Sequence, residues 1–400
     1  MGMGKKLCEN FKVASDIFDE ASESLSEDVK KLCFESSLEE LTLTKNAQPA
    51  ILTVSMAMYH TWLQEIGIMP DMVAGHSLGE ITALTCAGAI NFADAVKIAR
   101  KRGEFMQEAV EPGKGLMAAV KTRDVNRLKR LCEEVSNGNE IVSISNYNSG
   151  VQTVISGDKS AVEKILDLLS KEDIKATLLN VSAPFHCPLM QKAADKLEEE
   201  LQKYHFEELR HTVISNVTAS PYQGKKQIIS NLKEQLVLPV QWVNSMKYLK
   251  KTMVRYCIEL GPKSVMKDMM KKNIADIPVL SYDVEKDANG ARQYIDSLYV
   301  PFLSRAMGLA VATRNSNWDS VAYEKGVVEP YNKVQKIQQL IEDENRTATE
   351  DEMQEGINML RSVFKTKLVT EDEQIERFKE LFQDSGTVKL FENFQVPTMN

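Results

Sequence analysis

One short stretch constrains the fold of this chain more than any other: Gly75-His-Ser-Leu-Gly79, a G-x-S-x-G pattern. The apolar run Met72–Ala74 precedes it and is predicted to be the end of a buried strand. Residues 80–88 follow with helical composition and apolar side chains at helical spacing. A strand, a tight turn and a helix in this order are the context in which such a serine forms a nucleophile elbow.

The two glycines of the pattern have a steric purpose. A serine on a sharp, strained turn needs neighbours without a Cβ, so that strand and helix can approach closely. Ser77 Oγ would then project above the sheet. The Leu78 N–H would point at the carbonyl oxygen of an attacked acyl group, aided by the positive end of the helix. The alternative is an ordinary strand–helix turn with a solvent-exposed serine.

The composition is that of a globular protein of about two to three domains. Of the 400 residues, 43 % are apolar and 26 % charged. A net charge of −8 without a dense Lys/Arg cluster argues against nucleic-acid binding, and no apolar run is long enough to span a bilayer. The start lacks an extended apolar region, so no signal peptide is expected. The six cysteines are scattered and form no C-x-x-C, so neither a metal site nor a disulfide framework is expected, and a reducing cytoplasm is the expected compartment.

Strand and helix patterns alternate along the first two thirds of the chain, which predicts an α/β fold with a mostly parallel sheet. We expect an α/β core of residues 1–114 and 183–282. Between them, residues 115–182 have the β-α-β-β-α-β pattern of a ferredoxin-like subdomain. Residues 283–400 are rich in charged and amide side chains at helical spacing, and predict a helical C-terminal extension with solvated faces rather than a catalytic part.

Local signals place individual helix ends. Gln48-Pro49 is expected to open a helix over residues 50–63, because proline suits the first helical turn. In the C-terminal extension, residues 345–350 and Val369-Thr370 are typical of N-cap regions.

A serine nucleophile needs a base, and the chain has five histidines. His76 lies inside the elbow, where its side chain is expected to point away from Ser77; three others lie in a helix or in a charged segment. His186 is different, because Pro184 and Pro188 bracket its loop and hold it at fixed angles. Loops at strand ends are where α/β folds place their sites. His186 is therefore the candidate base, and since no Asp or Glu stands out as its partner, a backbone carbonyl is expected to orient it.

Five motifs follow one another in an order that points to a known family. They are Gly75–Gly79, Arg100-Lys-Arg-Gly-Glu-Phe-Met-Gln107, Ala183-Pro-Phe-His-Cys-Pro-Leu-Met190, Pro239-Val-Gln-Trp242 and Glu259-Leu-Gly-Pro262. Together they closely resemble malonyl-CoA:acyl-carrier-protein transacylases, the stand-alone enzymes of fatty-acid and polyketide synthesis. The resemblance covers residues 1–280, and the whole chain looks most like the free-standing acyltransferases of iturin- and mycosubtilin-type lipopeptide clusters.

The resemblance implies an α/β-hydrolase-like core and a two-step acyl transfer. Ser77 would take malonyl from coenzyme A as an ester and pass it to the phosphopantetheine thiol of an acyl carrier protein or a carrier domain of a synthase. His186 would relay the proton both ways. Arg102 matches the arginine that pairs with the free carboxylate of malonate, which a planar guanidinium can bind bidentately; without the family match it would be read as a surface arginine. No cofactor is implied, because malonyl-CoA is a substrate.

Three further positions take roles from the same resemblance. Gln48 matches a glutamine of the acyl pocket, and Gln241 matches the residue whose main chain helps orient the histidine. Phe185, directly before His186, resembles the malonyl-selective form, because a bulkier methylmalonyl unit usually goes with a small residue there.

Members of this family begin with a strand followed by Phe-Pro-Gly-Gln-Gly, whose glutamine helps build the oxyanion hole. In this sequence Gly2-Met3-Gly4 resembles the end of that opening. The first strand and the glutamine are missing from the sequence. Loss of one oxyanion donor costs about 100- to 1000-fold in rate, and loss of a central strand would expose sheet edges. We therefore expect a translation start placed too late rather than a working truncated enzyme.

Two other functions stay open at this point. The same Ser–His pair with water as acceptor would make an acyl-thioester hydrolase. Arg102 discriminates against it, because a hydrolase that releases neutral acyl chains has no use for that charge. The alternative of a different class is a non-catalytic docking module for carrier proteins.

Overall fold

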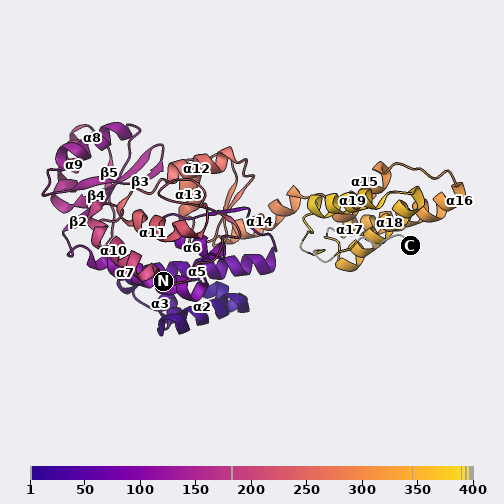
Figure 1. The fold of residues 1–400 in the computed structure, drawn as a ribbon, viewed down its shortest axis with the longest axis horizontal. Helices are drawn as coiled ribbons and strands as arrows, with labels where there is room; N and C mark the ends of the chain where they lie inside the picture. The colour runs from indigo at the N-terminus through magenta and orange to yellow at the C-terminus, as the bar shows by residue number, and fades with distance from the viewer. Residues whose placement is uncertain (1, 182, 345, 389, 392–393, 396–400) are drawn as a thin grey trace. The chain divides into compact units, whose positions relative to one another are not determined.

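The computed structural model describes residues 2–181, 183–344, 346–388, 390–391 and 394–395 (Figure 1). The chain divides into two compact units, Met1–Ala288 and Asn289–Asn400. Within the described residues, no helix is both long and apolar enough to cross a membrane.

Helices dominate the first hundred residues of the first unit, which otherwise contain only the short strand Met72–Ala74 among the residues described. The helices are α1 (Lys5–Asn10), α2 (Lys12–Leu25), α3 (Val29–Phe34), α4 (Leu38–Thr42), α5 (Thr44–Glu65), α6 (Leu78–Cys86) and α7 (Phe92–Glu108). The central α5 has α2 and α3 on one side and α6 on the other (Figure 1).

The prediction that Gln48-Pro49 opens its helix was wrong. Helix α5 begins at Thr44, and Pro49 lies inside it. Proline has no N–H to donate back along the helix, so this turn needs support from elsewhere. Two side-chain hydrogen bonds tie this turn to α7: Arg100 Nη1 donates to Asn46 Oδ1 (2.6 Å) and Arg102 Nη1 donates to Gln48 Oε1 (2.7 Å). Tertiary contacts thus override the local signal.

The parallel strands form two pairs rather than one continuous sheet. β1 (Met72–Ala74) pairs with β6 (Thr212–Ile214), and β7 (Cys257–Glu259) pairs with β8 (Val279–Ser281). β1 is half-buried, whereas the sequence predicts a buried strand, because β6 is its one neighbour among the described residues. The helices of this part are α10 (Gln191–Leu201), α11 (Ile228–Val237), α12 (Trp242–Lys251) and α13 (Val265–Lys271), with 3-10 turns at Pro188–Met190 and Lys225–Gln227.

A separate antiparallel sheet lies between the two halves of the core in sequence. Its strands are β2 (Gly115–Val120), β3 (Val142–Ser149), β4 (Gln152–Asp158) and β5 (Ala176–Leu178), in the order β3-β4-β2-β5. α8 (Val125–Val135) and α9 (Lys159–Lys171) pack on it around an apolar core of their own (Figure 1). The main chain of Val240 bonds to β3 through Ser145 and Tyr147, both at 2.9 Å, which joins this sheet to the segment that leads into α12.

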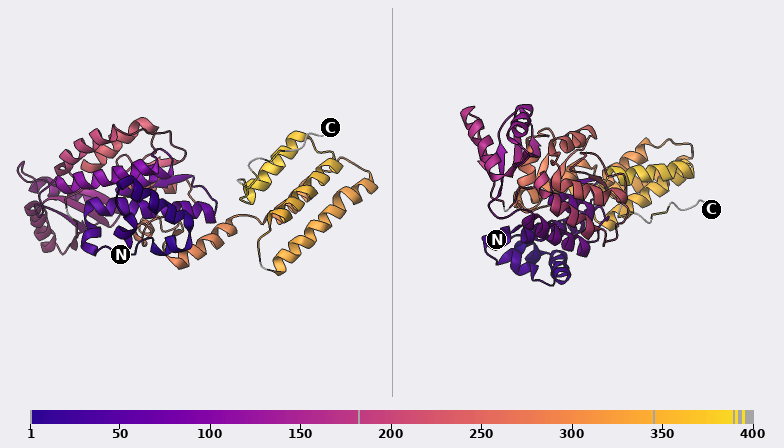
Figure 2. Two further views of the ribbon diagram at one scale, coloured as in Figure 1. Left: turned by 90° about the horizontal axis from the view of Figure 1, so that it is seen from below. Right: turned by 60° about the vertical axis from the view of Figure 1, so that its left-hand side comes forward.

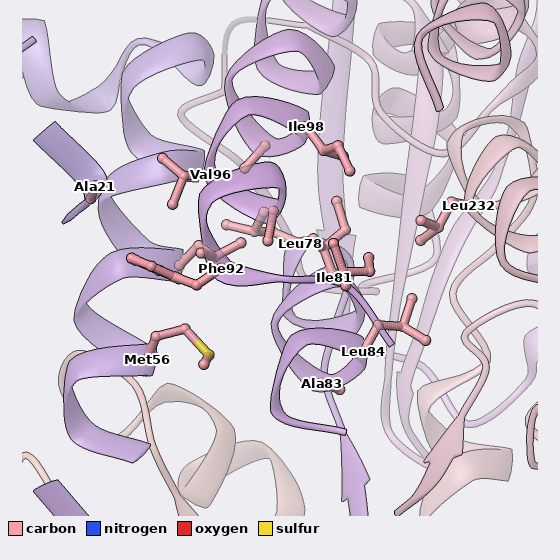
Figure 3. Close-up of a cluster of buried hydrophobic side chains, with 14 of the residues drawn as sticks. Ala21, Met56, Leu78, Ile81, Ala83, Leu84, Phe92, Val96, Ile98 and Leu232 are labelled. Carbon is pink, nitrogen blue, oxygen red and sulfur yellow. The ribbon is translucent and has the colours of Figure 1, made fainter. Parts of the chain in front are cut away.

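The largest apolar core holds the helix that follows the elbow. Figure 3 shows Ile81 and Leu84 of α6 between side chains of the neighbouring helices, among them Met56 of α5, Ile98 of α7 and Leu232 of α11. These α6 side chains are fully buried. The first turn of α6, which carries the elbow, is therefore held in place by dense packing on several sides.

The second unit is helical and has its own core. Its elements are α15 (Phe302–Ala312), α16 (Ser320–Tyr323), a π-helical turn (Glu324–Val328), α17 (Glu329–Asp343), α18 (Glu350–Lys367) and α19 (Glu371–Asp384), while α14 (Glu285–Leu298) spans the boundary between the units. Figure 2 shows α15, α17, α18 and α19 packed as a bundle. Its core contains buried side chains such as Leu303, Phe364 and Phe378. Thr349 and Glu352 form a capping box at the start of α18, and Thr370 is the N-cap residue of α19.

Candidate active site

The elbow turn joins β1 to α6 and holds Ser77 in a rare backbone conformation. Its φ is 55° and its ψ −108°, a strained region for a residue with a Cβ. Gly75 is sterically required, because a Cβ there would lie 2.0 Å from the Gly79 carbonyl carbon and oxygen. A Cβ at Gly79 would meet nothing within 4 Å. The predicted close approach of strand and helix therefore explains the first glycine but not the second.

Ser77 and His186, 109 residues apart in the chain, meet in one hydrogen bond. Ser77 Oγ lies 2.8 Å from His186 Nε2, and His186 Nδ1 lies 2.6 Å from the main-chain oxygen of Gln235. Because a carbonyl can only accept, Nδ1 carries the proton and Nε2 is free to accept one from the serine hydroxyl.

The surroundings of His186 keep its imidazole neutral. Its side chain is 3 % exposed. Burial, followed by the nearby charge of Arg102, lowers the pKa of His186 to about 3, and the hydrogen bond to Gln235 acts in the opposite direction. A neutral imidazole next to the hydroxyl can take up its proton.

The residue whose main chain holds the histidine is Gln235, and the prediction of Gln241 was wrong. Gln241 is the N-cap of α12, so its carbonyl accepts the first helical bond, from the Ser245 N–H (2.9 Å). Gln235 lies near the end of α11, where the helical donor for its carbonyl would come from residue 239. That residue is Pro239, which has no N–H, and the carbonyl is left for His186. A proline four residues after a helical glutamine is the sequence signal for this free carbonyl.

Arg102 comes from α7 and reaches the nucleophile. It is 1 % exposed, which excludes the alternative of a surface arginine. Nη1 donates to Gln48 Oε1 (2.7 Å), and Nη2 donates to Gln235 Oε1 (2.7 Å) and Ser77 Oγ (3.1 Å). The Nε–H has no partner, and Arg102 forms no ion pair in the described part of the chain. Burial lowers the pKa of the guanidinium to about 10, opposed by the charge of Glu80.

Asn216, which the sequence analysis missed, holds both sides of the elbow. Its Oδ1 accepts from the Ser77 N–H and its Nδ2 donates to the Gly75 carbonyl, both at 2.7 Å. Asn216 lies just beyond the carboxyl end of β6, where parallel sheets place their sites, and that position could have singled it out. The Leu78 N–H, the first of α6, has no acceptor among the described residues and is available to a ligand.

The two remaining neighbours of the pair make contacts away from Ser77. His76 Nε2 lies 3.0 Å from Asn148 Oδ1, and its ring packs edge-on against Trp242. Phe185 is half-buried against the main core, and its N–H points at the sulfur of Met117 (3.4 Å). Over the residues described, no group of three or more His, Cys, Asp or Glu could hold a metal ion.

Comparison with known proteins decides the family. Residues 1–294 match the acyl transferase domain family. A malonyl CoA-acyl carrier protein transacylase from Bacillus subtilis is 36 % identical over 390 residues, which cover 95 % of this chain and 96 % of the relative. The transacylase of Escherichia coli strain K12 is 41 % identical over 273 residues, covering 68 % and 88 %. The chain belongs to the malonyl-CoA:acyl-carrier-protein transacylase family.

Solved structures agree with this assignment and with the predicted α/β class. The transacylase of Clostridium perfringens has a TM-score of 0.71 and 37 % identity, with 74 % of this chain and 93 % of that one covered. A malonyl transacylase in complex with its type II polyketide-synthase acyl carrier protein has a TM-score of 0.71 and 36 % identity, with 74 % and 95 % covered. The family resemblance drawn from the five motifs is confirmed. The more specific likeness to lipopeptide-cluster enzymes stays a prediction.

Proposed function

We propose that this protein transfers malonyl groups from malonyl-CoA to the phosphopantetheine thiol of an acyl carrier protein or carrier domain. One observation carries the choice of acyl group: Arg102 is buried without an ion pair, and its Nη2 is 3.1 Å from Ser77 Oγ. A buried cation that contacts no carboxylate is costly, and the charge of Glu80, which acts on Arg102 without touching it, opposes the effect of burial only in part. An acyl group bound to Ser77 that carries its own carboxylate, as malonyl does, removes that cost.

In the first half-reaction, His186 Nε2 takes the Ser77 hydroxyl proton as Oγ attacks the thioester carbonyl carbon. The Leu78 N–H stabilises the oxygen on which charge develops. When the tetrahedral intermediate collapses, the carbon–sulfur bond breaks, and the coenzyme A thiolate leaves with the proton from His186. Ser77 then carries malonyl as an ester.

The second half-reaction reverses these steps with another thiol. His186 takes the proton of the phosphopantetheine thiol, whose sulfur attacks the ester carbonyl carbon. The carbon–oxygen bond to Ser77 breaks, and Oγ receives the proton from His186. Both half-reactions use the same imidazole as base and then as acid, and no cofactor takes part.

The other site residues take supporting roles in this proposal. Gln48 holds the guanidinium of Arg102 from one side, through a 2.7 Å hydrogen bond. Phe185 takes from the family resemblance the role of favouring malonyl over a branched acyl group. The carrier protein is the expected partner, as in the complex of a related transacylase with its carrier protein.

We also propose a division of labour along the chain. Residues 1–114 and 183–282 form the catalytic core, residues 115–182 the ferredoxin-like insert, and residues 283–400 a non-catalytic helical extension. The boundary between the two compact units, at residues 288 and 289, supports the start of the extension. Six free cysteines support a cytoplasmic location, because a reducing compartment keeps thiols unpaired.

Radiolabelled malonyl-CoA tests this function. We expect a stable label on Ser77, which moves to a phosphopantetheinylated carrier protein when that protein is added. Release of free malonate instead of transfer would indicate a thioester hydrolase. Absence of any label on the protein would indicate a non-catalytic docking module.

A further inference from the structure

A buried carboxyl group lies beneath the elbow and takes no part in the proton transfers. Glu80, in the first turn of α6, is 0 % exposed. Its Oε1 accepts from the Asn216 N–H (3.1 Å) and from the Tyr222 hydroxyl (2.6 Å), and its Oε2 accepts from Gln235 Nε2 (2.5 Å). Both carboxyl oxygens therefore face donors.

The neighbours of Gln235 determine which way its side-chain amide points. Its Nε2 faces Glu80 Oε2 and the Ser77 carbonyl (2.9 Å), both acceptors. Its Oε1 faces Arg102 Nη2 (2.7 Å), which can only donate. An amide orientation has to be inferred from such a network, and here all three neighbours require the same one.

We propose that Glu80 is a positioning residue that acts through the Gln235 side chain to hold the Arg102 guanidinium where it meets the carboxylate of the acyl group. This inference rests on the proposed function, in which Arg102 recognises malonyl. The main-chain carbonyl of Gln235 holds His186 independently of its side chain. Glu80 should therefore affect the choice of acyl group more than the proton transfer.

Substitution of Glu80 by glutamine keeps the shape of the side chain, removes the charge that acts on Arg102 and changes one acceptor into a donor. The Asn216 N–H is a backbone donor and keeps the new amide oxygen on its side. The new NH₂ group then faces the NH₂ group of Gln235. To avoid two opposed donors, the Gln235 amide must turn over, which places its oxygen against the Ser77 carbonyl and its NH₂ against Arg102. The guanidinium loses an acceptor and must move.

The test compares Glu80→Gln with the wild type in transfer to a carrier protein, with malonyl-CoA and acetyl-CoA as donors. We expect the ratio of kcat/KM for malonyl-CoA to that for acetyl-CoA to fall about tenfold or more, the loss typical of one hydrogen bond to a charged group. An unchanged ratio in folded Glu80→Gln protein would overturn the proposal.

Two further variants separate this role from a general loss of packing. Gln235→Leu removes the amide but keeps the main-chain carbonyl, and should lower the ratio by a similar factor. Because Glu80 acts through this amide, Glu80→Gln combined with Gln235→Leu should lower the ratio no further than Gln235→Leu alone. If the two losses multiply in the double variant, the proposal is contradicted. A wild-type ratio in Gln235→Leu would also contradict it, and this second result can be obtained even if Glu80→Gln fails to fold.

Tyr222→Phe is the matched control. It removes one donor to Glu80 but leaves the acceptor that faces Gln235, so the melting temperature should fall while the ratio stays. A fall in the ratio equal to that of Glu80→Gln would show that any disturbance of Glu80 suffices, and would overturn the role of the amide orientation. A wild-type protein without a preference for malonyl would instead refute the proposed function, which makes the two failures distinguishable.

Discussion

Each of the two units of the chain contains a buried cation, and the two cations differ in how fully their N–H groups are hydrogen-bonded. In the C-terminal unit, Lys367 Nζ donates to the carbonyls of Ala310 and Thr313, both at 2.8 Å, and thereby satisfies the end of α15. In the catalytic unit, Arg102 is held by two glutamine side chains, and its Nε–H has no partner among the described residues. Lys367 serves its own fold, whereas Arg102 retains the capacity to bind a ligand.

A second comparison lies within α7. Arg100, two residues before Arg102, is also buried, but it forms an ion pair with Glu27 and donates to Asn46. Its charge is therefore already neutralised within the fold. Of these three buried cations, only Arg102 combines the lack of a direct ion pair with a position beside the nucleophile. Burial alone does not mark a functional cation; a charge that lacks a direct ion pair and lies next to a reactive atom does.

Removal of the base should have the largest effect on activity. His186→Ala leaves no group to take the Ser77 proton, and we expect malonyl transfer to slow by about 100- to 10,000-fold. The measurement is the rate at which label from malonyl-CoA appears on Ser77. His205→Ala is the control, because His205 is exposed and pairs with Glu207 on the surface, and it should keep the wild-type rate. A wild-type rate in His186→Ala would refute the Ser–His pair.

Removal of the Arg102 guanidinium should have the next largest effect, and only on the transfer of malonyl. Arg102→Ala should lower kcat/KM for malonyl-CoA by about 100-fold, the value of a charge-assisted bidentate pair, and should spare acetyl-CoA. Arg100→Ala removes a buried guanidinium of equal size from the same helix and should leave the ratio of the two substrates unchanged. Equal losses of malonyl and acetyl transfer in Arg102→Ala would contradict the role of its charge.

The effect of Arg102 on His186 predicts how activity depends on pH. Burial and the charge of Arg102 lower the pKa of His186 to about 3. The imidazole therefore stays neutral at pH values well below its ordinary pKa of about 6.5. The acid limb of kcat/KM should therefore lie far below pH 6.5. Arg102→Gln removes the second of the two causes and should move that limb toward higher pH, as measured with acetyl-CoA, which carries no carboxylate. A limb near pH 6.5 in the wild type would contradict a buried, neutral base.

The parts of the site that could be predicted from the sequence are those with a local signal. The elbow follows from its pattern and flanking elements, and His186 follows from its proline-bracketed loop. The role proposed for Arg102 needed the family resemblance, because nothing local distinguishes this residue from Arg100. The start of α5 was misplaced because the prediction rested on Pro49 alone, whereas the first turn of α5 is also tied to α7, more than 50 residues away, by side-chain hydrogen bonds.

The network around the elbow could not be predicted from local patterns. Gln235 is an ordinary polar residue in an amphipathic helix, and it contacts Ser77, 158 residues earlier in the chain. Glu80 would be read as a favourable acidic residue in the first turn of α6, and only the fold shows that it is fully buried. Such roles arise from contacts between distant segments, which pattern and propensity do not report.

The smallest expected effect is the loss of stability on replacing Lys367, whose ammonium group is hydrogen-bonded within its own unit. Lys367→Met keeps an unbranched side chain but leaves two carbonyls at the end of α15 without their donor, which should cost about 1–3 kcal/mol in the free energy of unfolding of the C-terminal unit. Thermal unfolding followed by circular dichroism measures it.

Lys365→Met is the matched control for Lys367→Met, because Lys365 lies on the same helix, is exposed, and forms no ion pair in the described part of the chain. It should leave the stability almost unchanged. Lys367 contacts only its own unit in these bonds, so malonyl transfer by Lys367→Met should stay at the wild-type rate at temperatures where the unit is folded. A loss of transfer in folded Lys367→Met, comparable with that of Arg102→Ala, would mean that the C-terminal unit takes part in the reaction. The contrast between Lys367, which stabilises the end of a helix, and Arg102, which is available to bind a ligand, would then no longer hold.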